Sequence, residues 1–73
     1  MVRVIVSVHD YSTAEVKLHR IELEKGWQTD DVEELLGTEL GYHVSEIEFM
    51  VSENDLTVNL PDGGYLVIPV DPE

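Results

Sequence analysis

The stretch from residue 27 to residue 41, WQTDDVEELLGTELG, constrains the fold most, because it is the one segment with clear helical periodicity. Its apolar residues Val32, Leu35, Leu36 and Leu40 recur at intervals that place them on one face of a helix. The remaining positions are largely acidic, and the sequence on either side alternates as strands do. The pattern therefore predicts one helix that packs its apolar stripe on one face of a β-sheet and turns carboxylates to water.

The ends of this helix also have sequence signals. Thr29 or Asp30 can act as the N-cap, and with Asp30 in that role Glu33 occupies the N3 position of a capping box. Gly37 lowers helix propensity, so we expect either an early helix end or a neighbour packed closely on this position. Gly41 is the expected left-handed stop.

Five segments have the composition and alternation of strands. They are residues 2–9, 14–24, 46–52, 56–60 and 65–70. The first two are joined by a turn at residues 10–13 and are expected to form a hairpin, and the PDGG sequence at residues 61–64 predicts a second tight turn. The last segment is apolar on both faces, which is typical of an interior strand.

The second strand changes its pattern partway along. Val16 and Leu18 fall on one face by alternation, whereas Ile21 and Leu23 fall on the other. A β-bulge near His19 would bring all four side chains to the same side, and we therefore predict one there.

The predicted order is β-β-α-β-β-β within a single α+β domain spanning residues 1–73, with the helix on a mixed or antiparallel sheet. This order, with an N-terminal hairpin, one crossing helix and an apolar last strand, resembles the ubiquitin-like β-grasp fold. The resemblance implies that the first and last strands pair in parallel at the centre of the sheet. A helix packed on a plain antiparallel meander is the alternative.

The charge of the chain is its strongest compositional feature. Sixteen acidic residues and four basic residues give a formal net charge of -12. A folded protein of this mass exposes roughly 4,600 Å², so there is one net negative charge for every ~380 Å² of surface. Such a protein should repel nucleic acid and anionic membranes and attract basic protein surfaces.

Compartment and chemistry are constrained by what the sequence lacks. There is no cysteine, which excludes disulfides and thiolate chemistry, and no segment with the length of a signal peptide or a membrane span, so we expect a cytoplasmic protein. The three histidines have no metal-binding spacing, and no serine lies in a nucleophile motif. We therefore predict no enzymatic activity, no cofactor and no metal site.

The acidic pattern suggests a protein-binding surface instead. Glu22 with Glu24, and Glu46 with Glu48, are pairs two residues apart on expected strands, so each pair spans about 6.5–7 Å. This spacing is of the order of the phosphate spacing along a nucleic-acid strand. The candidate partner-binding residues are Glu22, Glu24, Asp30, Asp31, Glu34, Glu46 and Glu48, together with Tyr42 and Met50 as exposed apolar anchors. Trp27 is expected to pack where the helix meets the sheet.

The first hypothesis is therefore a small acidic protein that blocks a basic, nucleic-acid-binding protein by electrostatic mimicry of DNA, as phage-type inhibitors of host defence do. A ubiquitin-like interaction module, or a small subunit of a complex, with incidental acidity is the second. Adaptation of the surface to a high-salt cell is the third. A homodimer formed through an exposed edge strand is compatible with each of them.

Overall fold

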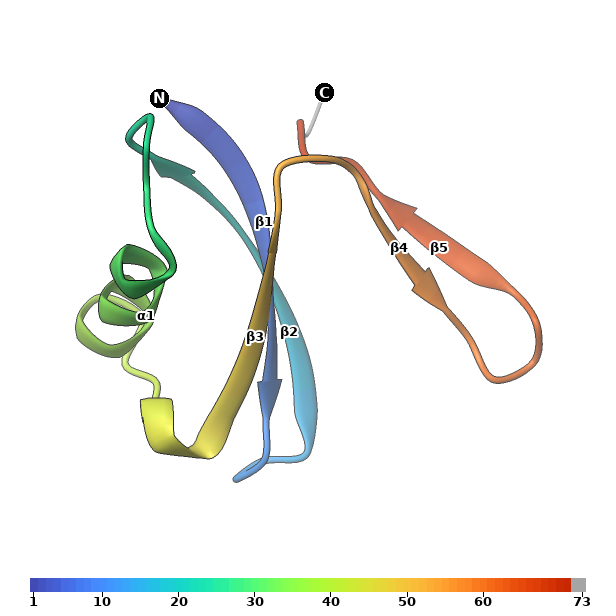
Figure 1. The fold of residues 1–73 in the computed structure, drawn as a ribbon. Coiled ribbons are helices and arrows are strands. Elements are labelled where there is room, and N and C mark those ends of the chain that lie inside the picture. The colour runs from blue at the N-terminus through green and yellow to red at the C-terminus, as the bar shows by residue number, and fades with distance from the viewer. Residues whose placement is uncertain (72–73) are drawn as a thin grey trace.

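The computed structural model describes residues 1–71 and confirms an α+β fold with the order β-β-α-β-β-β (Figure 1). The elements are β1 (Val2–Asp10), β2 (Glu15–Leu23), α1 (Thr29–Thr38), a 3₁₀ turn η1 (Val44–Glu46), β3 (Ile47–Ser52), β4 (Leu56–Asn59) and β5 (Tyr65–Ile68). No helix within residues 1–71 has the length and apolar character needed to cross a lipid bilayer.

The strands form two separate sheets. β1 is the central strand of a three-stranded sheet with the order β2-β1-β3, and it pairs antiparallel with both neighbours. β4 and β5 pair only with each other among the described residues. The parallel pairing of first and last strands that a β-grasp requires is therefore not formed, and β5 is not the interior strand that its composition predicted.

The hairpin of β1 and β2 has no bulge. Its register runs without interruption from Val2 opposite Leu23 to Asp10 opposite Glu15. Ile21 and Leu23 therefore face the helix side of the sheet, whereas Val16 and Leu18 lie on the opposite side. The prediction of a bulge was wrong because it assumed that only one face of this strand carries apolar side chains.

The core lies between the sheet and α1. β1 contributes Val4, Val6 and Val8, each fully buried, and α1 contributes Val32 and Leu36. Ile47 and Leu23 complete the buried cluster, and a ring of partly buried side chains surrounds it. Leu40, the last residue of the predicted stripe, is instead exposed because the helix has already ended.

The helix ends differ slightly from the sequence prediction. The N-cap is Gln28, whose backbone N–H donates to the Asp31 carboxylate at 2.8 Å, so Asp31 rather than Glu33 takes the N3 position. After Thr38 the chain turns at Gly41, which has φ +77° as expected, and the Tyr42 N–H donates to the Leu36 carbonyl.

The β4-β5 hairpin, residues 56–68, forms an arm that leaves the sheet on the side opposite α1 (Figure 1). Its PDGG turn is closed by hydrogen bonds between Leu60 and Gly64 and between Gly63 and Leu60, as the sequence predicted. The segment after β5 returns to the sheet, where Arg20 donates to the Pro69 carbonyl at 2.9 Å and Arg3 donates to Asp71 at 3.2 Å. The root of the arm is therefore tied to the main sheet.

Candidate protein-binding site

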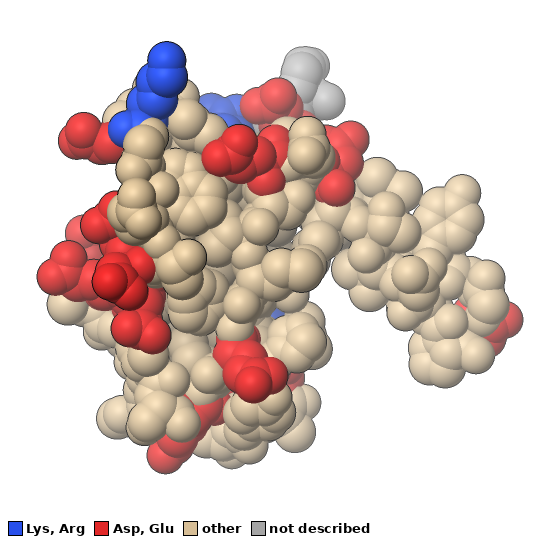
Figure 2. Space-filling view, in the orientation of Figure 1, with Lys and Arg blue, Asp and Glu red and all other residues tan. Residues whose placement is uncertain are grey.

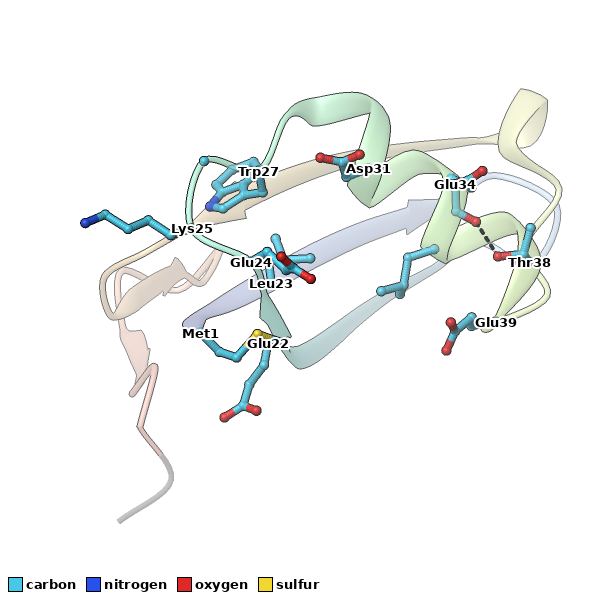
Figure 3. A pocket seen from close by; sticks show the side chains of 12 residues that line it. Met1, Glu22, Leu23, Glu24, Lys25, Trp27, Asp31, Glu34, Thr38 and Glu39 are labelled. Atoms are coloured by element: carbon cyan, nitrogen blue, oxygen red, sulfur yellow. Dashed lines mark hydrogen bonds between the residues drawn. The ribbon is translucent and has the colours of Figure 1, made fainter.

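An acidic cleft lies between α1 and the end of β2, with a cavity volume of about 450 Å³. Five acidic residues from two parts of the chain line it (Figure 3), but the Glu22 carboxylate points to the sheet face opposite α1, where it pairs with Arg3. Glu22 lies near the end of β2 and Glu24 directly follows this strand, whereas Asp31, Glu34 and Glu39 come from α1 and its C-cap. Four of these five belong to the residues that the sequence singled out, so the cleft joins two acidic groups that are separate in the chain.

The helix side of this cleft is fixed by local hydrogen bonds. Asp31 is held by its bond to the Gln28 N–H at the helix start. Further along the helix, the Thr38 hydroxyl donates to the backbone carbonyl of Glu34 at 2.7 Å. The side-chain carboxylate of Glu34 takes no part in this bond. Residues at positions 31, 34 and 38 lie three or four apart and therefore share one helix face. Asp31 and Glu34 therefore lie on the same side of the cleft.

The floor of the cleft is apolar. Leu23 is buried, and Leu35 and Trp27 are partly buried against the core. The Trp27 indole N–H donates to Glu53 at 3.0 Å, which holds the ring where the helix meets the sheet, as predicted. A lysine or arginine side chain has an apolar stem and a charged end, and this combination of floor and rim matches both parts of it.

Few basic side chains oppose these acids. Arg3 bonds to Glu22 at 3.1 Å and to Asp71, and Lys17 lies 3.4 Å from Glu15. Lys25 also lines the cleft, but its side chain points away from the other labelled side chains in Figure 3. The surface over α1 is consequently strongly acidic, as Figure 2 shows. Within residues 1–71, Glu24, Glu34 and Glu39 form no ion pair.

The other predicted partner-binding residues lie outside the cleft. Glu46 ends η1 instead of starting a strand, so Glu46 and Glu48 do not form the expected pair along one strand. Glu48 accepts a hydrogen bond from the Tyr11 hydroxyl at 2.7 Å, and this bond raises the pKa of Tyr11. Asp30 is exposed in the first helical turn, and Met50 is 53% exposed, as expected for an anchor.

Tyr42 is not an exposed anchor. It packs against the core, and its hydroxyl lies 2.6 Å from Nε2 of His19, which faces the helix side of the sheet. Burial, and to a lesser extent the nearby charge of Lys17, lower the pKa of His19. A neutral His19 can accept a hydrogen bond from the Tyr42 hydroxyl at Nε2, so this pair is a partly buried structural contact between β2 and the segment after α1.

Among the described residues there is no cluster of three or more metal-ligating side chains.

Asp10 accepts hydrogen bonds from the Ser12 hydroxyl and backbone N–H, and these contacts lower its pKa and close the β1-β2 turn. The apolar floor was the part of this site that the sequence did not predict as functional, because Leu35 and Trp27 have the pattern of core residues.

No family model matches this chain, and no curated protein or solved structure is significantly similar to it.

Proposed function

We infer that this protein is a non-enzymatic binding protein that occludes a basic surface of another protein, in the position that nucleic-acid phosphates would otherwise take. The observation that carries the proposal is one cleft with an apolar floor that is lined by acidic residues from α1 and from the end of β2, among them Glu24, Glu34 and Glu39. Lysine and arginine side chains that normally hold phosphates would meet these carboxylates, and the partner could then no longer bind nucleic acid.

The charge of the whole molecule supports this mechanism. A net charge of -12 on an 8.3 kDa protein produces a negative field that accelerates encounter with a basic surface. The cleft then supplies orientation, because its apolar floor accepts the stem of a basic side chain while the rim pairs with its charge. Association should therefore be fast and should weaken strongly as salt is added.

The test is capture of a basic protein from host lysate on the immobilised chain, with elution by excess duplex DNA. The captured protein, once purified, is then titrated against a variant with Glu24→Lys and Glu34→Lys. We expect this variant to bind at least about 10-fold more weakly, because two like-charge contacts replace two attractive ones.

A matched control separates the cleft from net charge. Glu33→Lys with Glu46→Lys makes the same change in charge at two exposed positions that do not line the cleft. This control should retain most of the affinity. Equal weakening by both variants would show that only the overall charge matters, and release of the captured protein by salt but not by DNA would argue against mimicry of nucleic acid.

A further inference from the structure

The arm has an apolar face that the rest of the chain covers only at its root. In the β4-β5 register Leu56 lies opposite Ile68, and Val58 lies opposite Leu66, so these four side chains share one face. Leu56 is buried at the root, Val58 and Ile68 are partly exposed, and Leu66 nearer the tip is 53% exposed. The apolar face therefore continues beyond the point where its own molecule covers it.

The arm is also almost free of charge. Between Leu56 and Val70 the only charged residue is Asp62, in the turn at the tip, although the chain has sixteen acidic residues. Figure 2 shows the same contrast between the arm and the acidic surface over the rest of the molecule. A two-stranded hairpin is marginal in water unless another element packs on its apolar face. The exposed half of this face therefore needs a partner.

A second uncovered apolar area lies on the sheet face opposite α1. In the registers of the three strands, Ser7 lies between Leu18 of β2 and Met50 of β3, so these residues form one row across the sheet. Leu18 and Met50 are exposed, and the adjoining row has Val16, which is 64% exposed, beside His9 and Glu48. The chain segment near Pro69 and Asp71 covers only the other end of this face, beside Arg20 and Arg3.

The chain exposes more surface than a compact monomer of its mass would, and the excess is comparable to the area that one partner buries in an ordinary interface. It exposes 5215 Å², which is about 600 Å² more than the roughly 4,600 Å² expected for a compact monomer of this mass. The radius of gyration is 12.8 Å, compared with about 11 Å for a compact chain of this length. A standard interface takes about 800 Å² from each partner. The excess surface is thus close to what one subunit of a dimer would bury.

We propose that two copies of this chain form a symmetric dimer in which the apolar face of each arm packs on the row Leu18–Ser7–Met50 of the other copy. A two-fold axis makes both contacts equivalent and leaves neither arm uncovered. Two molecules of charge -12 repel each other, so they can associate only where charge is sparse; the arm has Asp62 alone, and the row Leu18–Ser7–Met50 has no charged residue. The dimer leaves the acidic cleft on the helix side free and does not depend on the proposed function.

Sedimentation equilibrium of the purified full chain tests the dimer directly. We expect the mass to rise from 8.3 kDa toward twice that value with increasing protein concentration, and to rise further in high salt, because screening reduces the repulsion between subunits. The response to salt is opposite to that expected for the cleft, so failure of one proposal is distinguishable from failure of the other. A mass of 8.3 kDa at every concentration and salt level would overturn the dimer.

Variants identify the contact. Leu66→Glu on the arm and Met50→Lys on the sheet face should each give a monomer, with folding checked by circular dichroism. Thr57→Glu is the matched control, because it adds the same charge as Leu66→Glu on the other face of the arm and should leave the dimer intact.

A mixture of the two monomeric variants gives the sharpest result. One contact then places the glutamate introduced on the arm of the first variant against the lysine introduced on the sheet face of the second. The other contact is unchanged, so a heterodimer should form where neither variant alone dimerises. A mixture that stays monomeric, or a Leu66→Glu variant that dimerises as the wild type does, would contradict contact between arm and sheet.

Discussion

At the scale of single residues, His19 is a titratable group whose surroundings differ from water in a way that affects stability. Its ring is partly buried on the helix side of β2, bonds to Tyr42, and lies near the positive charge of Lys17. Both burial and Lys17 disfavour the protonated ring, and the pKa of His19 is lowered for this reason.

This direction predicts how stability depends on pH. A histidine whose pKa is lower in the folded state binds fewer protons there than in the unfolded chain, so the free energy of unfolding falls as the pH drops below about 6.5. We expect urea unfolding midpoints to decrease between pH 7.5 and pH 5.5 by more in the wild type than in His19→Gln. An equal decrease in the two proteins would show that protonation of His19 carries no penalty in the folded state.

Gly37 was recognised from the sequence as an anomaly, and the structure supplies its reason. A Cβ built at this position would lie 3.3 Å from a methyl group of Val44 in η1, so the glycine permits η1 to pack closely on α1. The sequence could predict that something lies against Gly37, but it could not identify Val44, because that contact depends on the path of the chain after the helix.

The contact predicts different outcomes in two backgrounds. In the wild type, Gly37→Ala should change the free energy of unfolding by less than about 0.5 kcal/mol, because the gain in helix propensity is offset by displacement of Val44. In a Val44→Ala background the same substitution should stabilise the protein by about 0.5–1 kcal/mol. Equal stabilisation in both backgrounds, measured by urea unfolding, would show that Val44 does not limit this position.

At the scale of elements, local pattern predicted which segments are strands and helix but not which strands pair. The valines of β1 recur at every second position because one face of the strand packs on α1, and this was readable from the sequence. β5 is apolar on both faces, which looks the same in a sequence whether the strand is interior or extends from the sheet. The alternation of apolar and polar residues shows which face of a strand is apolar. It does not identify the element that covers that face.

The change of pattern in β2 has the same explanation. Ile21 packs near the core on the helix side, whereas Val16 and Leu18 lie on the open face. A bulge would be needed only if all four apolar side chains of β2 faced a single core. For the candidate site, the acidic residues could be predicted individually, but their convergence on one cleft required the register of β2 and the position of α1.

At the scale of the whole molecule, net charge couples stability to salt. The few basic side chains neutralise little of the charge of -12, so folding brings like charges closer together than they are in the unfolded chain. Screening reduces this repulsion, and added salt should therefore raise the urea midpoint without changing the slope of the transition. The measurement needs dilute protein, so that the proposed dimer does not contribute.

The variant with Glu33→Lys and Glu46→Lys tests this cause. Each substitution removes one negative charge and adds one positive charge, so the two together change the net charge from -12 to -8. Because repulsion among like charges grows roughly with the square of the net charge, the increase in midpoint caused by salt should fall to roughly half of that in the wild type. An undiminished increase would instead mean that salt acts by strengthening apolar burial, in which case sodium sulfate should raise the midpoint of both proteins equally and by more than sodium chloride does.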